Sequence, residues 1–198
     1  MRLLHLSDLH FGYDADETAK GQRELLLNSL LERVELRDVE VVMVTGDVAW
    51  QCREEGYREA GEWFRKLKAK IKDGAKLIGC CGNHDVDHAE CTELQYINDT
   101  EKIKSTLKLE KLPQLSRRFQ RYIAFCEENQ FEKLMLKEQQ NYLVGSADLG
   151  QLRFWVLNSA WYALNGGAQD QTHLWMGRNF FALLDLENQK KSTPALLH

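Results

Sequence analysis

The sequence predicts an α/β fold built on a parallel sheet, and three observations lead to this prediction. Three short apolar runs have the length and composition of buried strands, at residues 3–6, 39–44 and 76–81. A helical pattern of apolar residues lies between each run and the next. Strands that alternate with helices in this way form parallel sheets through right-handed crossover connections.

The two helical patterns repeat apolar residues every three or four positions, with polar residues between them. The first pattern consists of Leu26, Leu27, Leu30, Leu31 and Val34. The second consists of Tyr57, Ala60, Phe64, Leu67 and Ile71. Residues 3–81 are therefore expected to form a β-α-β-α-β unit.

The stretch 86–141 has a different character, because it is polar, charged and mostly helical in pattern. Its clearest apolar stripe is formed by Leu115, Phe119, Tyr122, Phe125 and Cys126. We interpret this stretch as a helical insertion or cap within one domain that spans residues 1–198.

Strand patterns return after the insertion. Two apolar runs, 142–145 and 152–157, are typical of a hairpin whose turn contains residues 148–151. A last helix is expected over about 180–190, and Pro194 opens a short apolar run that can begin a further strand.

The composition is that of an ordinary globular protein, with 43% hydrophobic and 28% charged residues among 198. No apolar run approaches the roughly 18 residues needed to span a bilayer, and the N-terminus is too short and polar for a signal peptide. The five cysteines include no C-x-x-C pair and are expected to be reduced. We therefore expect a cytoplasmic protein with no membrane partner. The net charge of −4 argues against a general nucleic-acid coat.

Each of the three predicted parallel strands ends in a polar cluster, at residues 7–10, 46–47 and 82–85. Because the carboxyl ends of parallel strands meet at one edge of a sheet, these clusters are expected to lie together. Asp8 and His10 are two positions apart, so an extended backbone would point both side chains the same way.

The side chains in these clusters are typical metal ligands. A mixture of carboxylate, amide and imidazole groups suits Mn, Fe or Zn. A carboxylate such as Asp47 can bridge two cations, and two neighbouring cations form a clamp for in-line attack on phosphorus. Glycines at 46 and 82 allow the backbone to turn sharply before each ligand.

The motifs Asp8-Leu9-His10, Gly46-Asp47 and Gly82-Asn83-His84-Asp85 resemble those of the calcineurin-like metallophosphoesterases. The segment Leu157-Asn158-Ser159 extends the resemblance, which is weak across 86–141. It implies a four-layer α/β/β/α sandwich and hydrolysis of phosphodiester or phosphomonoester bonds by a hydroxide that two divalent ions activate. The expected substrate is a phosphate ester, either a nucleotide or a nucleic acid.

The resemblance also implies metal ligands. Asp8 and His10 would bind the first ion, and Asp47 would bridge both ions. Asn83 would bind the second ion. His198, which follows a short apolar run, would be a further ligand of the second ion.

His84 would lie beside the phosphate, where it stabilises the transition state or gives a proton to the leaving oxygen. Asp85 would either orient the His84 ring or cap the following turn. The family's later Gly-His-x-His motif is absent from the 198 residues. We therefore expect a domain that is incomplete at its C-terminus, with further sequence in the full-length protein and with little activity in this chain alone.

Three functional interpretations stay open at this level. The first is a phosphodiesterase for small molecules or cyclic nucleotides, the second is a nuclease of the same fold that acts on DNA or RNA, and the third is a non-catalytic fragment or regulatory module. Trp50, Trp161 and Tyr162 follow strand-end motifs, so they either stack on a nucleobase or pack in the core and rim. Basic residues over 65–76 and in the insertion either form a solvated surface or steer an anionic substrate.

Overall fold

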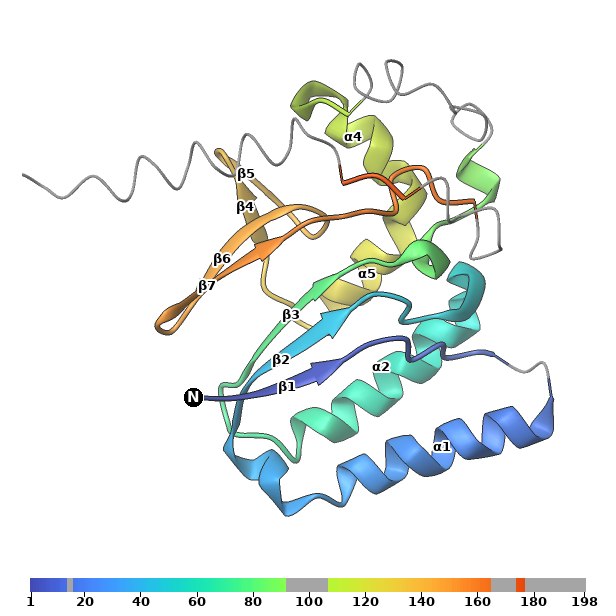
Figure 1. Cartoon of the computed structure of the whole chain (residues 1–198), viewed down its shortest axis with the longest axis vertical. Helices are drawn as coiled ribbons and strands as arrows, with labels where there is room; N and C mark the ends of the chain where they lie inside the picture. The colour runs from blue at the N-terminus through green and yellow to red at the C-terminus, as the bar shows by residue number, and fades with distance from the viewer. Residues whose placement is uncertain (14–15, 92–106, 165–173, 177–198) are drawn as a thin grey trace, which may run out of the picture.

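The computed structural model describes residues 1–13, 16–91, 107–164 and 174–176 (Figure 1). The expected helix over 180–190, the run after Pro194 and the candidate ligand His198 lie outside the described residues. No helix in the described ranges is long and apolar enough to cross a membrane.

The first sheet is parallel, as the sequence predicts. It contains β1 (Arg2–Leu6), β2 (Val39–Thr45) and β3 (Lys76–Cys80) in the order β1-β2-β3. Leu6 pairs with Val44, and Thr45 pairs with Cys80. The three strands therefore finish at nearly the same level, which brings the polar clusters after them to one edge of the sheet.

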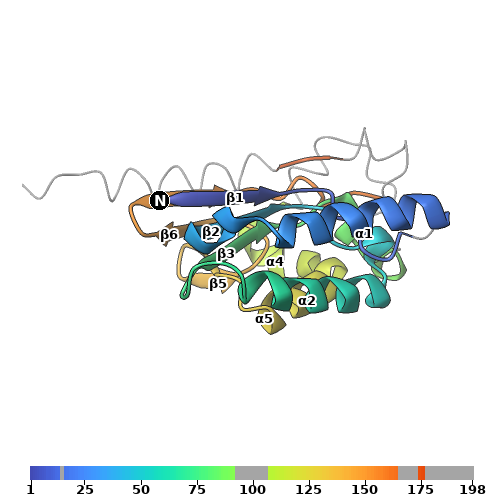
Figure 2. The ribbon, with the colours of Figure 1, turned by 90° about the horizontal axis from the view of Figure 1, so that it is seen from below.

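Helices α1 (Glu17–Leu31) and α2 (Glu54–Lys68) connect these strands and lie on one side of the first sheet (Figure 2). Asp16 caps α1, because its carboxylate accepts a hydrogen bond from the Ala19 N–H at 2.7 Å. The predicted apolar face of α1 is wrong at Leu26, whose side chain is 71% exposed. The other predicted leucines of this helix, Leu27, Leu30 and Leu31, pack on the core as expected.

The predicted stripe of α2 is confirmed, with Ala60, Phe64 and Leu67 fully buried. Short 3-10 helices interrupt the loops around these elements. They are η1 (Val34–Asp38), η2 (Trp50–Cys52), η3 (Asn83–Asp85) and η4 (Ala89–Cys91).

The region 107–128 is helical, as expected. It contains η5 (Leu109–Lys111), α4 (Leu112–Leu115), η6 (Ser116–Phe119) and α5 (Gln120–Glu128). The predicted stripe is confirmed, because each of its five residues is at most 2% exposed. Phe125 of α5 meets Phe64 of α2 edge to face at 5.5 Å between ring centroids, so this region shares the main core.

The expectation of helix is wrong beyond residue 133. A second, antiparallel sheet begins there, with β4 (Leu134–Leu136), β5 (Gln139–Asn141), β6 (Gly145–Leu149) and β7 (Leu152–Val156) in the order β5-β4-β6-β7. In β4, Leu134 and Leu136 are fully buried while Met135 between them is exposed. This two-residue period marks a strand, but three residues are too few to identify one from the sequence.

A hairpin forms with β7 where it was predicted, but the expected first strand and turn are misplaced, because β6 covers Gly145–Leu149 rather than 142–145. The two sheets contact each other through a small apolar cluster. Val41 and Ile78 of the first sheet pack there with Leu134 and Leu149 of the second. The expected sandwich has four layers. Three of them correspond to the helices on one side, the first sheet and the second sheet. The four-layer arrangement as a whole stays a prediction.

Candidate metal centre

The loops after β1 and β2 run side by side beyond the ends of their strands. The Asp8 N–H donates to the Gly46 carbonyl at 3.2 Å, and the His10 N–H donates to the Asp47 carbonyl at 2.9 Å. The Phe11 N–H then donates to the Val48 carbonyl at 2.9 Å. These bonds continue the pairing of the sheet into the loops, so they fix His10 beside Asp47.

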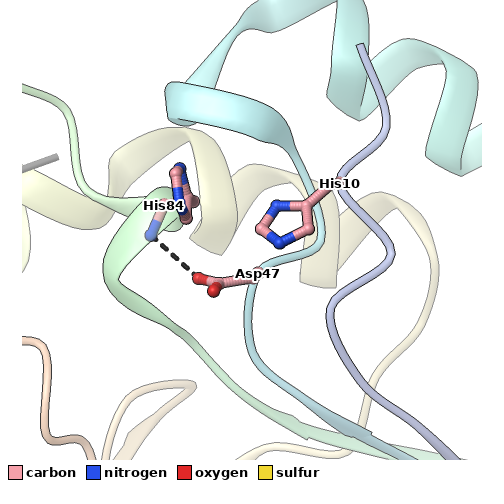
Figure 3. Close-up of side chains that lie close together, drawn as sticks. All are labelled: His10, Asp47 and His84. Atoms are coloured by element: carbon pink, nitrogen blue, oxygen red, sulfur yellow. Dashed lines mark hydrogen bonds between the residues drawn. The ribbon is translucent and has the colours of Figure 1, made fainter. Parts of the chain in front are cut away.

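The loop after β3 packs backbone to backbone against the loop after β2. Gly46 has a φ of +88° and lies against Gly82. A Cβ atom on Gly82 would lie 2.1 Å from Asp47 Oδ1. The close approach lets the His84 N–H donate to Asp47 Oδ1 at 2.8 Å (Figure 3). Glycine at position 82 is therefore required for Asp47 to adopt this conformation.

His10, Asp47 and His84 converge at the edge of the sheet (Figure 3). One potential ligand atom from each lies within 4.8 Å of the other two. Asp47 is 9% exposed and His84 is 6% exposed. His10 Nδ1 is buried and has no hydrogen-bond partner among the residues that the structure describes. An orphaned imidazole nitrogen beside a buried carboxylate fits a divalent transition metal.

Asp8 lies at the margin of this group. Its side chain is 66% exposed, and its Oδ1 is 3.9 Å from His10 Nε2. The expected extended backbone is wrong here, since Asp8 and His10 have φ values of +54° and +46°. The hydrogen bonds to the neighbouring loop impose this left-handed conformation. Asp8 and His10 are therefore close together for a different reason than strand alternation.

Asn83 and His84 occupy the first two positions of η3, directly after Gly82. Asn83 is half-buried at the same sheet edge. The structure thus brings five predicted site residues to one place: Asp8, His10, Asp47, Asn83 and His84. The sixth, His198, lies outside the described residues.

Asp85 is fully buried and anchors the two inner loops to each other. Its carboxylate accepts hydrogen bonds from the N–H groups of Gly82 at 2.8 Å and Asp47 at 2.9 Å. The Tyr57 hydroxyl of α2 donates to it at 2.8 Å. Burial raises the pKa of Asp85 to about 6, and the Gly82 N–H opposes this rise.

These bonds, which also extend to the N–H groups of Val48 and Ala49 at 3.4 Å, run to the loop after β2 and to Gly82 before Asp85 rather than to the following turn that it was expected to cap. The sequence pattern assigned Tyr57 only to the apolar face of a helix. Periodicity does not reveal that its hydroxyl donates a hydrogen bond to a buried carboxylate.

Aromatic rings surround the imidazoles. Trp50 stacks on His84 with 4.2 Å between ring centroids, and its edge meets His10 at 5.3 Å. Tyr13 contacts Trp50, with 4.6 Å between the ring centroids. Trp161 and Tyr162 are fully buried, so the core interpretation holds for both. Tyr13 was not singled out in the sequence, because a lone aromatic residue in a loop carries no pattern.

The basic residues after α2 belong to the charged surface. Lys72 forms an ion pair with Glu40 at 2.5 Å, and Lys76 forms one with Glu132 at 2.8 Å. In the helical region, Arg118 is buried and donates to the carbonyls of Trp161 and Ala163. These contacts favour a structural over a substrate-steering role for the basic residues involved.

Comparison with known proteins identifies one family. The family model of the calcineurin-like phosphoesterases matches residues 1–176. A search of curated proteins found no significant match.

Proposed function

The chain belongs to the calcineurin-like phosphoesterase family, whose members hydrolyse phosphoesters with divalent metal ions, and from this premise we propose that it is a two-metal phosphodiesterase. The observation that carries the proposal is the convergence of His10, Asp47 and His84 at the carboxyl edge of a parallel sheet.

Asp8, His10 and Asp47 would hold the proposed first ion. Asp47 and Asn83 would hold the second, with His198 as a further ligand. When bound, the divalent ions, Mn, Fe or Zn, supply a lowered pKa for a nucleophilic water and positive charge beside the phosphate oxygens. Asp47 is well suited to the bridging position. The His84 N–H restrains one of its oxygens, and Gly82 leaves room for it.

His84 is proposed to contact the phosphate. Its ring lies next to that of the proposed ligand His10, with 4.8 Å between centroids, which supports a role beside the ions. An imidazole can donate a hydrogen bond to a phosphate oxygen or, when protonated, a proton to the leaving oxygen.

The proposed substrates are phosphodiesters of nucleotide size rather than long nucleic acids. A nuclease groove needs unpaired basic side chains along the phosphate backbone. Lys72 and Lys76 pair with carboxylates and Arg118 is buried, so these three basic residues are not available for such a track.

A cytoplasmic location is part of the proposal. Four cysteines in the described ranges are free: Cys52, Cys80, Cys81 and Cys126. Free thiols are typical of reducing compartments.

The test measures Mn²⁺ binding by calorimetry and hydrolysis of bis-p-nitrophenyl phosphate in the full-length protein. Asp47→Asn should abolish hydrolysis and weaken Mn²⁺ binding by at least about tenfold. Asp148→Asn is the matched control, since Asp148 pairs with Arg153 on an exposed hairpin. Absence of transition-metal binding in the wild type would refute the metal centre. Faster cleavage of single-stranded DNA than of cyclic nucleotides would favour the nuclease instead.

A further inference from the structure

Trp50 contacts both imidazoles of the candidate site. Its indole lies nearly parallel to the His84 ring, with 24° between the planes and 4.2 Å between the centroids. The same indole meets His10 edge to face, with 73° between the planes. The Tyr13 ring also contacts the indole, with 62° between the two planes. The indole is therefore enclosed by aromatic groups, and it occupies one face of the His84 ring.

The turn that carries Trp50 holds an unfavourable backbone conformation. Gln51 and Cys52 follow Trp50 with φ values of +52° and +53°, which side-chain-bearing residues rarely adopt. Such strain persists only where surrounding bonds enforce it, and it occurs most often at functional sites.

Three hydrogen bonds enforce this turn. The Trp50 N–H donates to the Phe11 carbonyl at 2.8 Å, and the Arg53 N–H donates to the Trp50 carbonyl at 3.2 Å. The Arg121 guanidinium of α5 donates to the Cys52 carbonyl at 2.9 Å. The turn is thus held from the His10 loop and from α5 at once.

We propose that Trp50 is a positioning residue that fixes the plane of the His84 imidazole relative to Asp47 and His10. This inference rests on the proposed function and names a residue that supports the same site. The His84 backbone N–H donates to Asp47, and this bond does not by itself set the rotation of the His84 ring. Stacking on Trp50 restrains the plane of the ring, and the edge-to-face contact with His10 at 4.8 Å between centroids acts on the same ring. Because the indole is already stacked on His84, positioning rather than nucleobase binding is its role.

The variant Trp50→Leu keeps an apolar side chain but removes the flat surface. Contact between two aromatic rings favours the stacked geometry by a factor of up to about ten in its equilibrium constant. We therefore expect kcat to fall about tenfold while KM changes less than about twofold. Trp50→Phe restores a stacking surface and should keep kcat within about threefold of the wild type. Trp155→Leu is the matched control, because Trp155 lies on β7 and is 37% exposed.

A second measurement does not depend on activity. In an NMR spectrum of the protein with labelled histidines, the His84 ring protons should be shifted upfield by the stacked indole. The His84 signals are assigned by their absence from the spectrum of His84→Gln. Their upfield shift should be lost in Trp50→Leu and retained in Trp155→Leu.

The outcomes separate this inference from the proposed function. An active wild type whose Trp50→Leu variant keeps its kcat, or loses only substrate affinity, overturns the positioning role. Persistence of the His84 shift in Trp50→Leu overturns it as well. A wild type that shows the shift but hydrolyses no phosphoester overturns the proposed function, and with it any catalytic use of the positioned ring.

Discussion

The contact between Gly82 and Asp47 makes Gly82→Ala the sharpest perturbation of the site. The backbone of Gly82 has φ of −105° and ψ of −173°, which alanine adopts without strain. The effect is therefore steric. The added Cβ would lie 2.1 Å from Asp47 Oδ1, 2.6 Å from its backbone nitrogen and 2.7 Å from its Cγ.

The size of the effect follows from these distances. Side-chain Cβ atoms essentially never approach other heavy atoms within 3.0 Å. Asp47 must therefore withdraw by about 0.9 Å, and a misplacement of about 1 Å costs on the order of 10²-fold in rate. Overpacking of a tight site costs about 1–3 kcal/mol in the free energy of unfolding.

Mn²⁺ calorimetry, steady-state hydrolysis and urea unfolding measure the three consequences. Gly21→Ala is the control, since no atom lies within 4 Å of the position of its Cβ and alanine favours the helix α1. This control should raise stability by about 0.5–1 kcal/mol and leave Mn²⁺ binding unchanged. If Gly82→Ala binds Mn²⁺ and unfolds like the wild type, the argument that this glycine makes room for Asp47 is refuted.

Three further perturbations test how the site is supported. Asp85→Ala removes the acceptor of the Gly82 and Asp47 N–H groups and of the Tyr57 hydroxyl, so urea unfolding should show a loss of about 3 kcal/mol, and a loss under 1 kcal/mol would contradict its anchoring role. Arg118→Met leaves the carbonyls of Trp161 and Ala163 without their donor and should lower the free energy of unfolding by about 1–3 kcal/mol; unchanged stability would show that water replaces the guanidinium. Burial raises the pKa of the Cys52 thiol to about 12, so its thiolate stays scarce as the pH rises through the usual thiol pKa. Its labelling by a disulfide reagent at pH 8 should be slow until urea is added, whereas rapid labelling of the folded protein would contradict its burial.

The strands and the motif positions were predictable because both are local properties. The length and β-branched composition of a run such as Val39–Val44 favour a buried strand, and polar residues directly after it mark where the strand leaves the core. The parallel order β1-β2-β3 followed from the alternation of helices and strands. The short strands β4 and β5 were not predictable, because three residues carry too little periodicity.

The candidate site was likewise predictable only in part. The sequence predicted that Asp8, His10, Asp47, Asn83 and His84 meet at one sheet edge, since parallel strands bring their carboxyl ends together. It did not predict the left-handed conformation of Asp8 and His10, which depends on hydrogen bonds to a loop some 38 residues away.

The sequence by itself thus determined the order of the elements, the edge at which ligands gather and the chemical types of those ligands. Only the tertiary structure decided which groups support them: Asp85 between two loops and α2, and Trp50 against His84. The physical reason is that strand preference depends on neighbouring residues, whereas these contacts join segments that are far apart in the sequence. Their geometry is set by the register of the sheet and the packing of α2.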